Sequence, residues 1–151
     1  MGNIKKVRNL LIVEDSDDDY EAIERIVIKV NAENYIHRCK TAKDALDYLQ
    51  KKGPYENAND VKDIDIMFLD LNMPGMDGRD LLRIIRKDSC YKTLPVLVMT
   101  NSDYKKDIEE CYEIGANCYV KKPIEYDDFK FAYSHLAEFW LNAAQLPGDE
   151  R

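Results

Sequence analysis

Residues 66–76 read IMFLDLNMPGM, and this stretch decides how the rest of the chain is interpreted. Its first four residues, Ile66 to Leu69, are all apolar, which is typical of a strand buried on both faces. The run ends on Asp70, although burying an unpaired carboxylate is costly. An acid at that position therefore needs a partner or a chemical role.

Short apolar runs of the same kind recur along the chain. The predicted strands are LLIV at 10–13, YIHRC at 35–39, IMFL at 66–69, PVLVM at 95–99 and CYV at 118–120. Helical spacing of apolar residues separates or follows them, over 20–30, 42–49, 81–85, 108–112 and 129–143. This alternation predicts right-handed βαβ crossovers and an α/β fold, with helices on both faces of a parallel sheet. The polar stretch 53–63 is predicted to be a long connection.

Composition limits the possible functions. A chain of 151 residues with 45% apolar content is suited to one domain with a proper core. A net charge of −7 argues against a nucleic-acid binder, which would normally carry a basic stripe. The first apolar run stops at two acids, so it is neither a signal peptide nor a membrane span, and we expect a soluble, cytoplasmic protein.

Four cysteines stand at positions 39, 90, 111 and 118 without a CxxC pair. No histidine cluster near them gives a zinc-ligand spacing, so reduced thiols are expected. The two histidines, His37 and His135, are interpreted as packing or surface residues.

Chemically active residues follow four of the predicted strands. They are Glu14 and Asp15 after the first strand, Asp70 after the third, Thr100 at the end of the fourth and Lys122 after the fifth. In an open parallel sheet the carboxyl ends of the strands form one edge, where ligands bind. Carboxylates gathered there repel one another unless a cation intervenes, and Mg²⁺ is suited to carboxylate, water and phosphate oxygens.

This set of residues predicts phosphoryl transfer. Lys122 could pair with Asp70 or with an anion attached to it, and Thr100 could donate a hydrogen bond to that anion. Asp70 would then be a nucleophile that forms an acyl phosphate.

Four segments carry a resemblance to a known family. They are LLIVEDSDDD (10–19), FLDLNMPGMDG (68–78), PVLVMTNSD (95–103) and GANCYVKKP (115–123). In this order and spacing they resemble the receiver domains of two-component response regulators. The resemblance implies a flavodoxin-like (βα)5 three-layer sandwich with strand order 2-1-3-4-5. It also implies that a sensor histidine kinase or a phosphotransfer protein phosphorylates Asp70.

The resemblance assigns a metal site. Asp15 corresponds to the acid that binds Mg²⁺ directly, and Glu14 to the neighbouring acid that usually reaches the metal through water. Asp70 corresponds to the phosphoacceptor, which is also a metal ligand, and Asn72 corresponds to the residue whose backbone carbonyl completes the protein ligands.

The resemblance also assigns a switch. Lys122 corresponds to the lysine that contacts the phosphate, Thr100 to the switch hydroxyl and Tyr119 to the switch aromatic residue. Phosphorylation in the family draws the hydroxyl inward, lets the ring follow and remodels the surface of the fourth helix, fifth strand and fifth helix.

The end of the chain suggests a subfamily. Residues 1–147 are expected to form one receiver domain with an extended final helix, and 148–151 a short tail, without room for a DNA-binding output domain. The final helix FKFAYSHLAEFWLNAAQLP (129–147) carries Phe131, Tyr133 and Trp140 partly off its buried face. These features resemble single-domain receivers that partner bacterial phytochrome kinases and dimerise through the face of the fourth helix, fifth strand and fifth helix. Exposed aromatic residues there could equally cover the core.

Three further interpretations stay open at this stage. Asp17, Asp18 and Asp19 are interpreted as the acidic start and N-cap of the first helix. That helix is expected to carry kinase specificity, with Ile23, Arg25 and Ile26 as candidates. The alternatives to a phosphoacceptor are a receiver-like scaffold that is not phosphorylated and an aspartyl-phosphate phosphatase. The phosphatase is disfavoured because its DxD pattern needs an acid where this chain has Asn72, so no turnover enzyme is expected.

Overall fold

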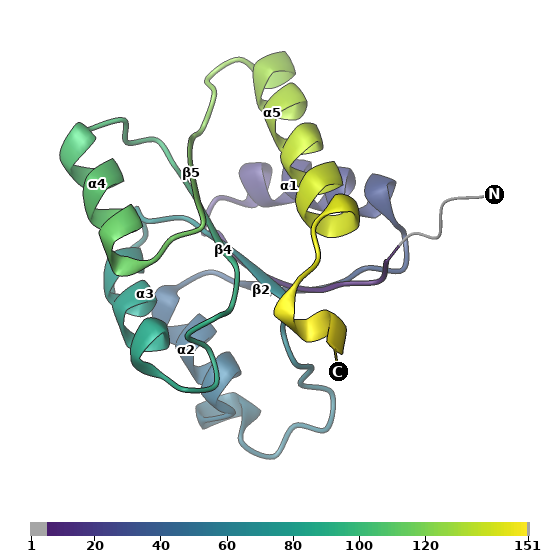
Figure 1. Cartoon of the computed structure of the whole chain (residues 1–151), viewed down its shortest axis with the longest axis vertical. Coiled ribbons are helices and arrows are strands. Elements are labelled where there is room, and N and C mark those ends of the chain that lie inside the picture. The colour runs from purple at the N-terminus through teal and green to yellow at the C-terminus, as the bar shows by residue number, and fades with distance from the viewer. Residues whose placement is uncertain (1–5, 151) are drawn as a thin grey trace.

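The computed structural model describes residues 6–150 and contains five strands and five α-helices in alternation (Figure 1). The strands are β1 (Asn9–Val13), β2 (Tyr35–Cys39), β3 (Ile66–Leu69), β4 (Val96–Thr100) and β5 (Cys118–Lys121). The α-helices are α1 (Asp17–Val30), α2 (Ala42–Gln50), α3 (Gly78–Lys87), α4 (Lys105–Ile114) and α5 (Tyr126–Glu138). A π-helical turn, η2 (Phe139–Ala143), continues α5, and two 3₁₀ turns, η1 (Gly53–Tyr55) and η3 (Pro147–Glu150), lie in connections.

All five strands are parallel, in the order β2-β1-β3-β4-β5. Helices α1 and α5 lie side by side against one face of the sheet, and α2, α3 and α4 cover the other (Figure 1). The predicted α/β fold, the strand order and the three-layer arrangement are confirmed.

Alternation along each strand divides the core into two layers. Leu10 and Ile12 of β1 face α1 and α5, whereas Leu11 and Val13 face α2 and α3. Strands β3 and β4 alternate in the same way. The central strands are therefore apolar at every position, since successive side chains point to opposite buried faces.

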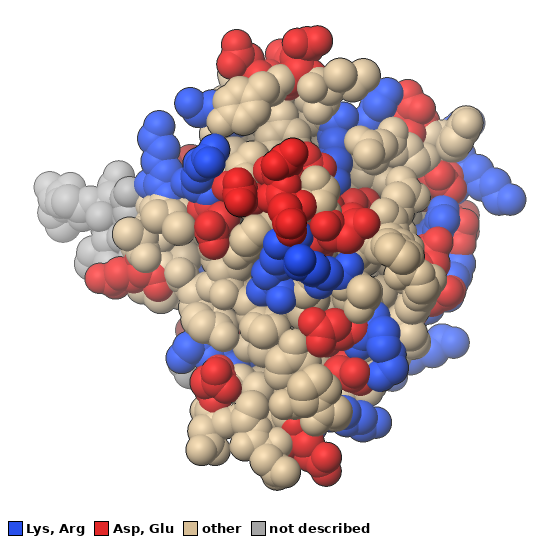
Figure 2. Space-filling view, turned by 180° about the vertical axis from the view of Figure 1, so that it is seen from behind, with Lys and Arg blue, Asp and Glu red and all other residues tan. Residues whose placement is uncertain are grey.

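The surface carries mixed charge. On the face seen in Figure 2, acidic side chains gather near the centre beside a group of basic ones, and the described residues form no continuous basic stripe across this face. Between residues 6 and 150, no helix has the length and apolar character that a membrane span requires.

The start of α1 differs from the prediction. Ser16 is the N-cap, and its hydroxyl accepts a hydrogen bond from the backbone N–H of Asp19 at 3.3 Å. Asp17, Asp18 and Asp19 all lie in the first turn, as predicted, where acids favour the helix dipole. The predicted N-cap role of the aspartates is wrong, because Ser16 caps the helix, and the carboxylate of Asp19 also binds Lys122.

The final helix is shorter than the predicted range 129–147. Its α-helical part ends at Glu138 and the π turn ends at Ala143. Tyr133, predicted to lie partly off the buried face, is 1% exposed and packs on Phe129 within the core. Phe131 does lie outside the core, with 68% of its surface exposed.

A buried arginine holds the chain after the π turn against the start of β1. Arg8 is 1% exposed and donates to the backbone oxygens of Leu141 (3.2 Å) and Ala144 (2.9 Å). It also forms an ion pair with Asp149, inside the segment predicted to be a tail. Leu146, between these contacts, is buried. The guanidinium thus satisfies backbone carbonyls that the helix end leaves without intrahelical partners.

We expect Arg8→Ala to lower the free energy of unfolding by about 2–4 kcal/mol, because it removes buried hydrogen bonds to the Leu141 and Ala144 carbonyls and the ion pair with Asp149. Denaturant unfolding followed by Trp140 fluorescence measures this. Lys29→Ala, at an exposed position of α1, is the control and should change the free energy by less than about 0.5 kcal/mol. An Arg8→Ala protein as stable as the control would contradict the assigned role.

Candidate phosphoacceptor site

The sheet itself brings the candidate residues together. Backbone hydrogen bonds between strands continue past the strand ends and hold Glu14, Asp70 and Lys122 at the carboxyl edge. The bonds run from Glu14 N to Cys39 O (2.9 Å), from Asp70 N to Val13 O (3.0 Å) and from Lys122 N to Thr100 O (2.7 Å). These three side chains therefore begin from fixed backbone positions at the carboxyl edge, and Glu14 and Asp70 flank the point where strand order reverses, between β1 and β3.

Lys122 lies at the centre of the site. Its ammonium binds three carboxylates, Glu14 Oε1 at 2.6 Å, Asp19 Oδ2 at 2.9 Å and Asp70 Oδ2 at 3.0 Å. The residue is 4% exposed. Burial disfavours the charged form, but the hydrogen bonds to Glu14 and Asp19 outweigh it and raise the pKa of Lys122 above its ordinary value. Lys122 is therefore a fixed positive charge.

Glu14 is fully buried beside this charge. Burial raises the pKa of the Glu14 carboxyl group to about 7, against the lowering effect of Lys122. Its second oxygen accepts a hydrogen bond from Ser16 N at 3.2 Å. Both oxygens of Glu14 thus have protein partners, and its main contact in the structure is with Lys122.

Asp70 is 4% exposed and is held by both of its oxygens. Oδ2 binds Lys122, and Oδ1 accepts from the backbone N–H of Asn72 at 3.1 Å. Gly78, the first residue of α3, packs directly under this loop. A Cβ atom at this position would lie only 2.9 Å from the Asp70 carbonyl oxygen. The burial penalty of the acid is therefore met by a cation, an amide and tight packing.

Carboxylate oxygens of Glu14, Asp15 and Asp70 lie within 4.8 Å of one another. Together with Asp19 they place four acids around a single lysine, so the site has an excess of negative charge. Asp15 is the exposed member, at the mouth of the cluster. The donor set, hard oxygens with an open side, fits a divalent cation such as Mg²⁺. The metal-ligand role of the Asn72 carbonyl stays a prediction.

The predicted switch hydroxyl, that of Thr100, is fully buried and accepts two hydrogen bonds. Thr100 Oγ1 accepts from the Asn72 side-chain amide at 2.8 Å and from Ser102 N at 3.4 Å. A hydroxyl that accepts hydrogen bonds keeps its own proton available for donation. Thr100 can therefore donate to an anion while Asn72 holds its oxygen in place.

Tyr119 connects β5 to the loop that precedes α4. Its hydroxyl donates to the Ser102 carbonyl at 2.8 Å, and the Ser102 hydroxyl donates to Asp107 of α4 at 2.6 Å. Ser102 also contacts Thr100 through its backbone amide. The predicted switch residues thus share one short chain of hydrogen bonds.

Two features of the site were missed from the sequence. One is the contact of Asp19 with Lys122, and the other is the contact of the Asn72 side chain with Thr100. The first had a usable signal, because side chains in a first helical turn tilt toward the helix N-terminus and so reach the sheet edge. The second depends on the loop conformation after β3, which composition does not reveal.

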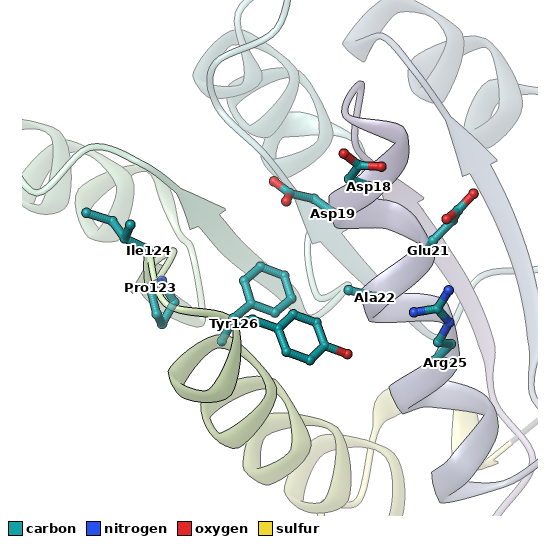
Figure 3. A pocket seen from close by; sticks show the side chains of 9 residues that line it. Asp18, Asp19, Glu21, Ala22, Arg25, Pro123, Ile124 and Tyr126 are labelled. Carbon is teal, nitrogen blue, oxygen red and sulfur yellow. The ribbon is translucent and has the colours of Figure 1, made fainter.

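A groove of about 370 Å³ opens beside the site, between α1 and the start of α5. Asp18, Asp19 and Arg25 line one side, while Ile124 and Tyr126 line the other, with Tyr126 pointing across toward α1 (Figure 3). Ile124 is 92% exposed. The predicted specificity residue Ile23 is 1% exposed in the core and does not reach this surface, whereas Arg25 lies on it.

Fold and site together define a receiver-type phosphoacceptor. The family model described as response regulator receiver domain matches residues 10–133, and the chain belongs to this family. It is a phosphoacceptor response regulator of two-component signalling, and its acidic cluster is a divalent-metal site of the kind that receiver domains carry.

Individual relatives agree along nearly the whole length. Response regulator Rcp1 of Synechocystis sp. is 30% identical over 91% of this chain and 92% of its own. The solved structure of the phosphorylated cyanobacterial phytochrome response regulator RcpA aligns with a TM-score of 0.87 and 30% identity, covering 93% of this chain and 99% of that one. The Mn²⁺-bound form of Rcp1 gives the same TM-score, identity and coverage.

The position of Lys122 yields a test of its role. Lys122→Ala removes a cation that competes with a metal for the carboxylates, so we expect Mg²⁺ affinity to be unchanged or several-fold higher. Isothermal titration calorimetry measures it.

Asp15→Asn is the matched control, because it removes a proposed ligand and should weaken Mg²⁺ binding by about tenfold or more. A large loss of Mg²⁺ affinity in Lys122→Ala would show that the lysine supports the metal site rather than the phosphoacceptor.

Proposed function

We propose that Asp70 accepts a phosphoryl group from a histidine kinase or phosphotransfer protein, with Mg²⁺ as the cofactor. The observation that carries this proposal is the salt bridge of 3.0 Å between the buried Lys122 ammonium and Asp70, within the acidic cluster of the carboxyl edge. A carboxylate that is buried, oriented by two donors and open to a divalent cation is suited to act as a nucleophile.

In the proposed step an oxygen of Asp70 attacks the phosphorus atom of a phosphohistidine. A new P–O bond forms as the P–N bond breaks, and the imidazole leaves with the electron pair of that bond. A bound divalent cation would supply neutralisation of charge on the phosphoryl oxygens. Glu14 and Asp19 keep Lys122 in position to contact the same oxygens.

The same geometry supports the switch. A phosphoryl group on Asp70 would add acceptor oxygens that the free proton of Thr100 can reach. Movement of Thr100 would disturb its contact with Ser102, which in turn holds Tyr119. The output we propose is a changed surface over α4, β5 and α5.

Two rival functions are less well supported. A phosphatase would need a second acid two residues after Asp70, where Asn72 instead donates an amide to Thr100. We therefore propose a protein that is not a turnover enzyme. A scaffold that is never phosphorylated would have no need for Asp15, Asp70, Thr100 and Lys122 at one edge.

The proposed donor is a bacterial phytochrome kinase. RcpA is a phytochrome response regulator, and the similarity of this chain to RcpA along most of its length supports the proposal. The groove between α1 and α5 combines acids, Arg25 and the exposed Ile124 next to Lys122, which suits docking of a helical phosphohistidine domain. A cytoplasmic protein without nucleic-acid or membrane binding is consistent with its net charge of −7.

Acetyl phosphate tests the phosphoacceptor without any kinase. With Mg²⁺, intact-mass spectrometry should show one added phosphoryl group on the wild-type chain and none on Asp70→Asn. Asp18→Asn, an exposed acid beside the site, is the control and should be modified like the wild type. Absence of modification on the wild-type chain would favour the scaffold.

We further propose a homodimer through the face of α4, β5 and α5. Phe131 and Phe139 are 68% and 56% exposed, and the ring of Phe131 lies 4.3 Å from that of His135. Tyr112 of α4 is 50% exposed as well, and exposed aromatic side chains of this kind are common at interfaces.

Sedimentation velocity, with and without acetyl phosphate and Mg²⁺, tests the dimer. Phe131→Ser should weaken association by roughly tenfold, since a central aromatic contact contributes about 1–2 kcal/mol. Ile28→Ser, which removes an exposed apolar side chain from α1, is the control and should associate like the wild type. A Phe131→Ser protein that still dimerises normally would place the interface elsewhere.

A further inference from the structure

A second group of metal-ligating side chains lies away from the acidic cluster, between β2 and α2. Ligand atoms of His37, Cys39 and Asp44 lie within 4.8 Å of one another. Cys39 is 1% exposed, and His37 and Asp44 are half-buried. The phosphoacceptor chemistry uses none of these three side chains.

Secondary structure fixes the arrangement. His37 and Cys39 are two residues apart on the edge strand β2, so their side chains share one face. Asp44 lies in the first turn of α2, which the Thr41 side chain caps by accepting from Asp44 N at 3.1 Å. The thiol, the imidazole and the carboxylate thus come from two rigid elements.

Two tyrosines build the surroundings of the cluster. The Tyr55 hydroxyl donates to Asp44 Oδ1 at 2.9 Å and lies 3.1 Å from His37 Nε2. The His37 ring stacks on buried Tyr48, with centroids 4.0 Å apart. Tyr55 comes from η1, within the long polar connection after α2. The hydroxyl oxygen of Tyr55 therefore lies between His37 and Asp44, two of the three ligand groups.

We propose that His37, Cys39 and Asp44 bind a transition-metal ion of the Zn²⁺ type, with the Tyr55 hydroxyl or a water as the fourth ligand. Three protein ligands with sulfur, nitrogen and oxygen donors match the ligand chemistry of Zn²⁺. The thiolate and imidazole distinguish this site from the acidic cluster, whose oxygen ligands favour Mg²⁺.

The two sites can be studied separately in the same protein. Excess Mg²⁺ would keep the acidic cluster occupied during a titration with a softer ion.

Co²⁺ is the probe, because a thiolate bound to Co²⁺ gives a charge-transfer band in addition to the visible bands of tetrahedral Co²⁺. Titration of the full chain in excess Mg²⁺ should show both sets of bands at one ion per chain, and Zn²⁺ should abolish them. Absence of the thiolate band would overturn the proposal.

Variants assign the ligands. Cys39→Ser should lose the thiolate band, and His37→Gln and Asp44→Asn should weaken Co²⁺ binding by about tenfold or more. Cys90→Ser, which removes an exposed thiol, should bind Co²⁺ like the wild type. A band that survives in Cys39→Ser but disappears in Cys90→Ser would overturn the assignment.

Circular dichroism checks that each variant is folded. If Cys39→Ser does not fold, the His37→Gln and Asp44→Asn titrations decide. Unchanged Co²⁺ affinity in both of them would overturn the proposal.

Discussion

The buried ammonium of Lys122, shared by Glu14, Asp19 and Asp70, is the interaction on which the rest of the structure depends. Breaking a buried ion pair by removing one partner costs about 3–5 kcal/mol, because the remaining charge has no partner. Each carboxylate comes from a different element, so the lysine brings the ends of β1, α1 and β3 to β5. The parallel sheet makes this possible, since its backbone hydrogen bonds place Glu14, Asp70 and Lys122 at one edge independently of their side-chain contacts. The remaining negative charge, increased by Asp15, suits the edge to a divalent cation and a phosphoryl group.

Signal output would begin at the same edge of the sheet, where Lys122 holds Asp70. The hydrogen bonds that join Asn72, Thr100, Ser102 and Tyr119 lead from the phosphoacceptor loop to the surface near α4. Such a series of hydrogen bonds has discrete arrangements, because each donor has a limited choice of acceptors in a buried site. Phosphorylation of Asp70 would change the charge at one end, and Tyr119 of β5 and Asp107 of α4 lie at the other. Local chemistry at the sheet edge can therefore bias binding at a distance without a change of fold.

The sequence predicted the layers and most of the site because both depend on local patterns. Continuous apolar runs predict buried parallel strands, and residues that follow strand ends must meet at one edge, so Asp15, Asp70, Thr100 and Lys122 could be assigned from the sequence alone. Tyr133 could not, because its burial depends on how α5 packs against α1 and the sheet. The contact of Asp19 with Lys122 depends on side-chain direction in the first turn of α1. The cluster of His37, Cys39 and Asp44 has no ligand spacing typical of zinc sites in the sequence, since the strand and the helix bring it together only in the folded chain.

The most direct test of the proposed chemistry is to locate the phosphoryl group on the chain. Borohydride reduces an acyl phosphate of aspartate to homoserine, which tandem mass spectrometry of peptides assigns to one position. After treatment with phosphodonor and Mg²⁺, we expect homoserine at position 70 and at no other acid. Homoserine at Asp15 or Asp19, with Asp70 unmodified, would contradict the claim that Lys122 prepares Asp70 as the phosphoacceptor.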